Sequence, residues 1–302
     1  MGAELGLSHL LTDRGATPHV VNDGRVPQIY RFLPGADRIG ESVEALRRDY
    51  DLVAVLDAPT ASRMGKVGEA LPTDAPVVVV DHHPPTKPFG DAMWTDTRAS
   101  SVGEMIYSLA LAGNWSVSPA AATCLYTAIM TDTGRFTYSN ATPTTFRIAA
   151  ELIELGADHV LVADNVYQQT SPGLMALRGQ AMATLALHAN GRIAVMRVTR
   201  GMFQRAGVDP VDAQEMADLP RSVACVQVGV LLTELPEDNA VKISLRSRGG
   251  LNIEPIARAF GGGGHPAAAG CRIHGTLEEA EAILTGRLKE LLDSCAAPER
   301  KT

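Results

Sequence analysis

The chain has 302 residues and a formal net charge of −7; 45% of the residues are hydrophobic and 20% are charged. This composition supports a buried core in one or two domains of roughly 100–200 residues each and argues against intrinsic disorder. The negative charge argues against long duplex DNA or RNA as a partner, because such binding needs an extended basic surface, but it allows a short anionic ligand held by a few local cations.

The first half of the sequence alternates helical and strand patterns. Alternation of this kind predicts a doubly wound α/β domain with a mostly parallel sheet and right-handed crossovers, which we assign to residues 1–156. The strands expected in chain order are residues 19–22, 52–57 and 77–81, and the expected helices are residues 2–14, 62–70, 101–112, 119–130 and 143–155.

The second half has a different pattern. A helical connection over residues 157–190 leads into a second, smaller α/β domain over residues 191–296. Its expected strands are residues 192–198, 223–232 and 240–246, its expected helices lie near Gln214 and over residues 252–260 and 277–292, and a glycine run follows residue 260.

The stretch Val77–Asp81 with His82 and His83 is the first chemical signal. Its four consecutive valines are typical of a strand buried on both faces, and the strand ends in a carboxylate and two imidazoles. Open α/β sheets bind ligands just beyond the carboxyl ends of their strands. We therefore expect metal binding or proton transfer here, although a surface loop could carry the same three residues.

Two further carboxylates follow expected elements. Asp57 ends the strand over residues 52–57, and Asp132 follows the helix over residues 119–130. Together with the imidazoles they suit a borderline-hard divalent ion such as Mn²⁺, with Zn²⁺, Co²⁺ or Mg²⁺ less favoured. The alternatives are that Asp57 caps the next helix and that Asp132 opens a simple turn.

A glycine-rich segment is the second strong signal. Gly261, Gly262, Gly263 and Gly264 precede His265, so the backbone can approach a ligand closely and present N–H groups to a phosphate. A flexible linker is the alternative. Lys242, Arg246 and Arg248 lie on or just after the preceding strand, where guanidinium groups suit phosphate and a solvated strand end is the alternative.

These segments together resemble the DHH family of phosphoesterases, in its subgroup of nanoRNases and pAp phosphatases (bifunctional oligoribonucleases). Five ordered motifs, spread over nearly the whole chain, carry the resemblance. They are LVAVLD at residues 52–57, VDHH at 80–83, TDTGRFTYSNATPTTFRIAAELIELGAD at 131–158, KISLRS at 242–247 and GGGGHPAAAG at 261–270.

The resemblance implies hydrolysis of phosphate esters by two metal ions, usually Mn²⁺, at a cleft between two domains. The implied substrates are RNA oligomers a few nucleotides long and 3′-phosphoadenosine 5′-phosphate; a cyclic or linear dinucleotide is the alternative. By motif, Asp57 corresponds to the carboxylate that bridges both ions, and His82 and Asp132 to ligands of the second ion. Asp81 corresponds to a residue that orients a ligand and His83 to one that contacts the scissile phosphate. The implied substrate-binding residues are Arg246, Ser247, Gly262, Gly263, Gly264 and His265.

The family's first motif, a strand ending in His-x-x-x-Asp-x-Asp, has no counterpart in the 302 residues, and residues 2–11 match the helix that follows it. His9 and His19 do not replace it, so the first ion keeps only Asp57 of its ligands. We expect the reading frame upstream of Met1 to encode the motif. The alternative is a catalytically impaired relative that binds nucleotides.

Cysteine usage and hydropathy bear on the compartment. The cysteines, at positions 124, 225, 271 and 295, form no Cys-x-x-Cys pair, so reduced thiols are expected rather than a disulfide framework or a zinc knuckle. The sequence has neither an apolar run of about 20 residues nor a basic-then-apolar N-terminal signal. We expect a cytoplasmic protein with no membrane partner, and a homodimer is compatible with these features.

Overall fold

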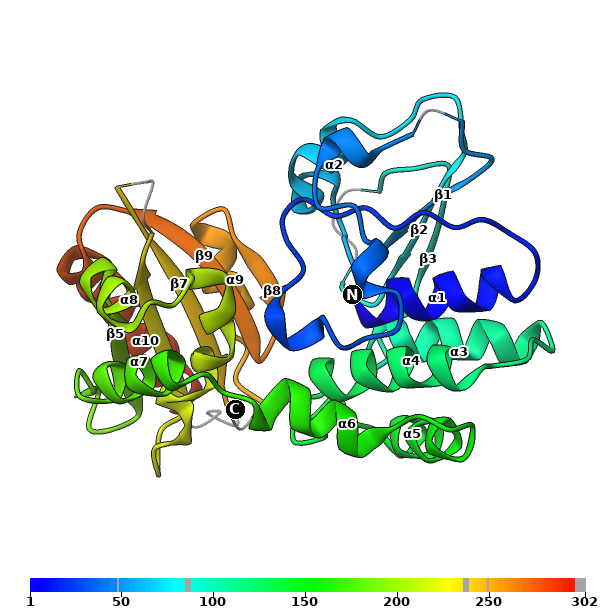
Figure 1. Cartoon of the computed structure of the whole chain (residues 1–302). Helices are drawn as coiled ribbons and strands as arrows, with labels where there is room; N and C mark the ends of the chain where they lie inside the picture. Colours follow the sequence, from blue (N-terminus) through cyan, green and yellow to red (C-terminus); the bar gives the residue numbers. More distant parts are fainter. Residues whose placement is uncertain (48, 85–87, 236–238, 249, 297–302) are drawn as a thin grey trace, which may run out of the picture. The chain divides into compact units, whose positions relative to one another are not determined.

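The computed structural model describes residues 1–47, 49–84, 88–235, 239–248 and 250–296, and the chain divides into two compact units, residues 1–169 and 170–302 (Figure 1). Each unit has its own sheet. The segment predicted as a helical connection contains helix α6 (His159–Ala163) in the first unit and helix α7 (Pro172–Met182) in the second.

The first unit is built on a parallel sheet of three strands in the order β1-β2-β3. Strand β1 is Val53–Leu56, β2 is Val77–Asp81 and β3 is Ala92–Thr95. The strands expected at residues 52–57 and 77–81 are therefore confirmed. Strand β3 was not predicted, because its four residues lie next to polar residues and show no strong alternation.

Helices cover both faces of this sheet, as a doubly wound domain requires. Val78 and Val80 belong to the core formed with α3 (Val102–Ala112) and α4 (Pro119–Asp132), while Val77 and Val79 belong to a smaller core with Met64 and Leu71, which flank α2 (Gly65–Glu69). The central strand is thus buried on both sides, which confirms the interpretation of the valine run. A parallel sheet in this setting confirms the predicted α/β class.

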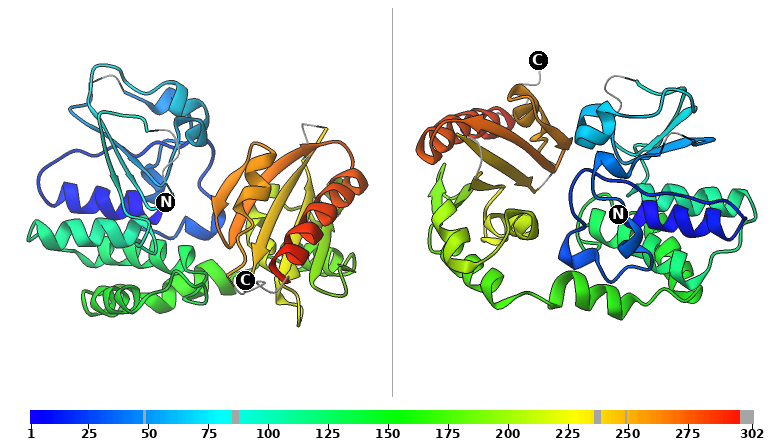
Figure 2. Two further views of the ribbon diagram at one scale, coloured as in Figure 1. Left: turned by 180° about the vertical axis from the view of Figure 1, so that it is seen from behind. Right: turned by 45° about the horizontal axis from the view of Figure 1, so that its top comes forward.

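Helix α4 is the centre of the helical layer. Helix α1 (Gly2–Thr12) and α3 lie beside it, and α5 (Pro143–Glu154) packs on its far side (Figures 1 and 2). Gly2 permits the close approach of α1, since a Cβ at this position would lie 2.5 Å from the carbonyl oxygen of Cys124. This packing fixes the C-terminal end of α4, where Asp132 lies.

The strand expected over residues 19–22 does not form, so this part of the sequence prediction is wrong. Among the described residues of that region only Val21 makes a bridge, to Gly40. Short 3₁₀ turns occupy the connection to β1 instead, at Gln28–Tyr30, Ala36–Arg38 and Val43–Ala45. The turn-forming Asn-Asp-Gly sequence at residues 22–24 stops the extended segment before it can form a ladder.

The second unit is built on a mixed six-stranded sheet in the order β4-β5-β6-β7-β9-β8, in which only β5 and β6 are parallel. Helix α10 (Leu277–Ala296) packs on one face through Leu284 and Leu288, and α7 and α8 (Arg200–Ala206) pack on the other (Figure 2). The strands are β4 (Ala186–His188), β5 (Ile193–Val198), β6 (Val228–Glu234), β7 (Ala240–Ser247), β8 (Gly263–His265) and β9 (Ala268–His274).

The glycine run contains a short strand that the sequence did not predict. The run follows α9 (Glu254–Ala259), and Gly263–His265 form an edge strand paired with β9. A Cβ at Gly262 would lie 2.1 Å from the carbonyl oxygen of Gly270, and one at Gly264 would lie 2.4 Å from that of Ala268. These glycines therefore let the edge strand approach β9 closely.

No helix in the part of the chain that the structure describes is long and apolar enough to cross a bilayer.

Candidate active site

Asp57 lies directly after β1, where the parallel sheet ends. Its main-chain N–H donates to the carbonyl of Val80 at 3.0 Å, and its φ of 61° is in the left-handed region that residues other than glycine rarely adopt. The side chain is 44% exposed. A strained carboxylate at the carboxyl edge of a sheet is a frequent feature of functional sites.

Asp81 is completely buried at the end of β2 and holds His83. One of its carboxylate oxygens, Oδ1, accepts the main-chain N–H of His83 at 2.8 Å and the Nδ1 of the same residue at 2.7 Å. The other oxygen, Oδ2, has no hydrogen-bond partner among the described residues. The carboxylate fixes the tautomer and the orientation of His83, so that Nε2 is the ring nitrogen left for another group.

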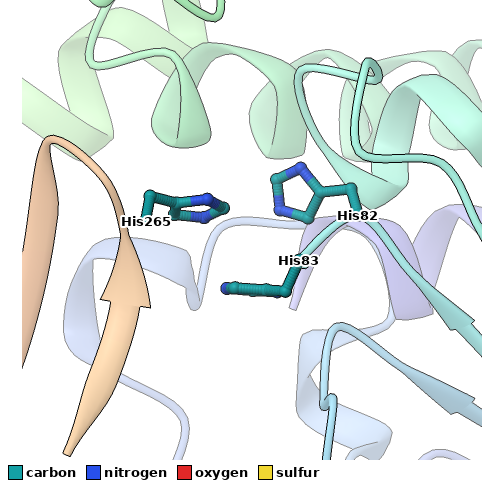
Figure 3. Close-up of side chains that lie close together, drawn as sticks. All are labelled: His82, His83 and His265. Carbon is teal, nitrogen blue, oxygen red and sulfur yellow. The ribbon is translucent and has the colours of Figure 1, made fainter. Parts of the chain in front are cut away.

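His82 is anchored in the opposite direction. Its Nδ1 donates to the carbonyl of Ala99 at 3.2 Å, and its Nε2 lies 3.4 Å from Asp57 Oδ1 and 4.0 Å from Asp132 Oδ2. Figure 3 shows the His82 and His83 rings side by side at the end of β2; their centroids are 4.9 Å apart with an interplanar angle of 75°. His82 therefore lies toward Asp57 and Asp132, whereas His83 is held by Asp81.

Asp132 is the last residue of α4. The side-chain amide of Asn140 donates to the carbonyls of both Asp132 and Ser100, at 3.1 and 3.0 Å. Three residues with positive φ, at positions 134–136, then turn the chain away from the helix. Asn140 thus ties the end of α4 to the loop that precedes α3, and it holds Asp132 where its carboxylate faces His82.

Ligand atoms gather into two overlapping groups in the first unit. One contains Asp57, His82 and Asp132, the other contains Asp57, Asp81 and His83, and in each group the ligand atoms lie within 4.8 Å of one another. Asp57 belongs to both. Carboxylates with imidazole fit Mn²⁺ or Zn²⁺ by donor type, and the unpartnered Oδ2 of Asp81 is a further acceptor facing no protein donor in the described chain.

The charges of this site shift the pKa values of its members. Burial alone would raise the pKa of Asp57, but a hydrogen bond from His82 and the nearby imidazoles lower it. For Asp132, burial and the charge of Asp57 outweigh the attraction of His82 and raise the pKa to about 7. Burial opposes charge on His82, yet the carboxylates of Asp57 and Asp132 raise its pKa to about 9. Positive charge is thus favoured between the two aspartates.

A buried network behind the site was not predicted from the sequence. Glu104, in the first turn of α3, accepts hydrogen bonds from the Ser100 hydroxyl at 2.6 Å and the Thr145 hydroxyl at 3.0 Å. The same loop supplies the Ala99 and Ser100 carbonyls that hold His82 and Asn140. The only sequence signal is the polar character of these residues inside otherwise apolar helical patterns.

In the second unit, strand register aligns Arg246 with His265. Arg246 on β7 is directly opposite Ala268 on β9, which in turn is opposite His265 on β8, so the three side chains share one face of the sheet. Figure 3 draws His265 on its strand. On the same face, the neighbouring row has Gly270 opposite Gly263. The predicted substrate-binding residues Arg246 and His265 thus lie in one row, with the small residue Ala268 between them.

Other predicted binding residues lie elsewhere. Ser247 follows Arg246 and is buried, and its hydroxyl donates to the carbonyl of Leu251 at 2.6 Å. Strand β7 ends at Ser247, so Arg248 lies beyond it and is exposed. Arg246 itself lies 3.6 Å from Asp218, a carboxylate that also pairs with Arg221 at 3.2 Å. Two guanidinium groups therefore lie near the Asp218 carboxylate.

The two N-terminal histidines are engaged elsewhere. His9 on α1 bonds through Nε2 to the carbonyl of Pro34 at 2.9 Å, and His19 bonds to the Tyr50 hydroxyl at 2.8 Å. Neither belongs to the ligand groups formed by the described residues.

Comparison with known proteins identifies the family. Residues 190–293 match the DHHA1 domain. The chain is 35% identical over 295 residues to the bifunctional oligoribonuclease and PAP phosphatase NrnA of Thermus thermophilus, a match that covers 96% of this chain and 86% of that one. The chain belongs to this family of DHH phosphoesterases. It is also 29% identical over 286 residues to the Bacillus subtilis protein of the same name, covering 94% of this chain and 88% of the relative.

A solved structure agrees with the family. The crystal structure of an exopolyphosphatase-related protein from Bacteroides fragilis matches with a TM-score of 0.87 at 25% identity, covering 97% of this chain and 89% of that one. Family membership confirms the resemblance inferred from the five motifs, and it makes phosphoric ester hydrolysis the enzyme class of this lineage.

Proposed function

We propose that this protein hydrolyses phosphate esters of short RNA oligonucleotides and of 3′-phosphoadenosine 5′-phosphate with the help of divalent ions, of which Mn²⁺ suits the ligands best. One observation carries the proposal: Asp57 belongs to two groups of metal-ligating side chains at the carboxyl edge of the first sheet. The chain that provides these groups is 35% identical to a protein named as an oligoribonuclease and PAP phosphatase.

The metal-binding part of the proposal assigns Asp57, His82 and Asp132 as ligands, with Asp57 as the carboxylate common to more than one ion. Their donor atoms lie within 4.8 Å of one another, and two aspartates compensate the charge of a cation. Bound ions would supply an activated water and stabilise charge that develops on the phosphate oxygens. The protein's part is to orient the ligands: the Ala99 carbonyl accepts a hydrogen bond from Nδ1 of His82, and Nε2 of the same ring then lies toward Asp57 and Asp132.

His83 is proposed to contact the phosphate that is cleaved. Asp81 accepts the hydrogen bond from Nδ1, so Nε2 is the ring nitrogen that can contact a phosphate oxygen, as a donor whenever the ring carries its second proton. Asp81 is thus proposed to position His83 rather than to touch the substrate.

Arg246 and His265 are proposed to bind the substrate in the second unit, together with the backbone of Gly262, Gly263 and Gly264. A guanidinium group suits a phosphate because it offers two parallel donors. The face of small residues between these side chains gives room for a ribose or a base. With short RNA as the substrate, we expect the protein to act in the cytoplasm.

The experiment is incubation of the chain with Mn²⁺ and, separately, with a labelled RNA trimer, 3′-phosphoadenosine 5′-phosphate and cyclic di-AMP. We expect mononucleotides from the trimer and adenosine monophosphate from the second substrate, with little activity in Mg²⁺ or in EDTA. Asp57→Asn should abolish both activities, and Asp96→Asn, which removes a partly exposed carboxylate paired with Arg98, serves as the matched control. Cleavage of cyclic di-AMP alone would overturn the substrate assignment.

A further inference from the structure

A cavity of about 250 Å³ lies in the second unit, on the face of the sheet that also carries Arg246. Its walls come from β5, β6, β7, β9, α8 and the 3₁₀ segment Pro210–Asp218. Phe203, Met216 and Leu231 form an apolar side, and Thr233, Lys242 and Arg272 form a polar side.

Strand register connects this cavity with the Arg246 row. Thr233, Lys242 and Arg272 are directly opposite one another across β6, β7 and β9, so their side chains share a face. Lys242 precedes Arg246 by four residues on β7, which separates the two rows by roughly 13 Å. Both rows are on the same face, because side chains alternate along a strand with a period of two.

The row of residues between the Arg246 row and the Lys242 row has only small side chains. It is formed by Ser244 on β7 and by Gly270 and Gly263, which are paired on β9 and β8. A Cβ at Gly263 would meet nothing within 4 Å, so the row is open above this glycine. A chain molecule longer than one nucleotide can therefore run from the Arg246 row to the Lys242 row without crossing a bulky side chain.

Lys242 contributes a positive charge beside the cavity. The side chain of Lys242 makes no hydrogen bond or ion pair with any residue in the described ranges, although β7 is an interior strand. Burial and the like charges of Arg272 and Arg246 lower its pKa. Lys242 on β7 and Arg272 on β9 therefore repel each other, and an anion in contact with Lys242 would relieve this repulsion.

The apolar side completes the chemistry of a nucleotide site. Small-molecule sites combine apolar and aromatic walls with a few placed polar groups, and Phe203 and Met216 provide such a wall. Aromatic side chains are the usual partners of nucleobases in proteins that bind single strands. The volume is below the roughly 300–1,000 Å³ of a pocket for a whole drug-sized ligand, so it suits one base.

We propose that this cavity, with Lys242 and Arg272 beside it, is a subsite for a second nucleotide of an oligonucleotide substrate. The base lies against Phe203 and Met216, and a phosphate lies between the two cations. The inference rests on the proposed function, since the first nucleotide is the one bound at Arg246 and His265. It assigns the preference for oligonucleotides over mononucleotides to residues of the second unit.

The test measures binding to the full chain in EDTA, where no hydrolysis occurs, by calorimetry at about 0.15 M salt so that distant charges are screened. The probes are adenosine 5′-monophosphate and 5′-phosphorylated diadenylate. We expect the dinucleotide to bind the unsubstituted protein roughly tenfold or more tightly than the mononucleotide, as one charge-assisted contact allows.

The decisive variant combines Lys242→Met with Arg272→Met. It should remove the advantage of the dinucleotide and leave the affinity for the mononucleotide within roughly twofold. Lys289→Met, which removes an exposed lysine from α10 on the opposite side of the sheet, is the matched control and should change neither affinity. An unchanged preference for the dinucleotide in the double variant would overturn the proposal.

A second variant tests the apolar side without changing charge. Ala213→Leu fills the cavity, and it should weaken the dinucleotide selectively while the melting temperature stays near that of the parent. A second mononucleotide bound per chain, with no preference for the dinucleotide, would overturn the proposal in favour of a separate effector site. Because these readouts need no turnover, loss of the proposed enzymatic activity would be detected independently in Mn²⁺.

Discussion

Asp81 holds His83 through a single carboxylate oxygen, which accepts both the main-chain N–H and the Nδ1 of the histidine, at 2.8 and 2.7 Å. The valine strand that buries Asp81 completely also fixes the direction of this carboxylate. The sequence order Asp-His-His thus places His82 toward Asp57 and Asp132, while Asp81 fixes the orientation of His83.

Asp81→Asn tests this positioning role. The amide can no longer accept two hydrogen bonds with the strength of a carboxylate, so we expect kcat to fall roughly 10- to 100-fold, as for other residues that orient a catalytic side chain, with KM and Mn²⁺ content close to those of the parent. Asp91→Asn is the control, because Asp91 accepts the Val77 N–H at 2.8 Å near the start of the same strand. Loss of bound Mn²⁺ from Asp81→Asn would make Asp81 a ligand instead.

Asp57→Ala tests the carboxylate common to both ligand groups. Because Asp57 belongs to each group, its removal should lower Mn²⁺ binding at more than one position and reduce kcat/KM by roughly 100-fold or more. Metal content after dialysis and activity are the measurements, and Asp96→Ala is the control. Unchanged metal content would show that the bridging assignment is wrong.

His265→Ala separates substrate binding from metal binding. His265 lies in the row with Arg246 and Ala268, in the unit that contains neither Asp57 nor His82. We expect KM for the RNA trimer to rise roughly tenfold while metal content is unchanged, since a single donor to phosphate is lost. His274→Ala, at the exposed end of β9, is the matched control. A fall in metal content with unchanged KM would contradict the assignment.

Strong local patterns were enough to predict part of the fold. The valine run determines β2 to the residue, because four β-branched side chains favour a strand and can all be buried only within a covered sheet. The glycine run was predicted as a ligand-binding segment, yet its pairing with β9 was missed. Glycine carries no side-chain signal for a strand, and the pairing depends on the close approach that Gly262 and Gly264 permit.

The supporting network of the site could not be predicted, for a physical reason. Asn140 donates to the carbonyl of Ser100, which is 40 residues away in the sequence. Glu104 accepts the hydrogen bond from the Ser100 hydroxyl at the start of α3. A single sequence gives no signal for such pairings. The same holds for Lys242 and Arg272, which become neighbours only through the register of β7 and β9.

The pKa of His82 is raised from 6.5 to about 9 in the folded protein, and that of Asp132 from 3.8 to about 7. Raised values mean that folding favours the protonated forms, so this stabilisation is complete below the unfolded pKa and is lost as pH rises through the folded one. The pKa of Asp57 is lowered instead, so its contribution is lost only in acid.

In EDTA, the melting temperature should therefore fall as pH rises from about 6.5 to about 9, chiefly through His82. Divalent ions bind the deprotonated ligands, so Mn²⁺ should bind more tightly as pH rises and should reverse or flatten this fall, with release of protons on binding. Calorimetry in buffers of different ionisation enthalpy measures those protons. His82→Asn should flatten the EDTA profile and abolish most of the proton release, and His274→Ala should leave both unchanged. If His82→Asn keeps the full pH dependence of the parent, then His82 is not the group that Mn²⁺ and protons compete for.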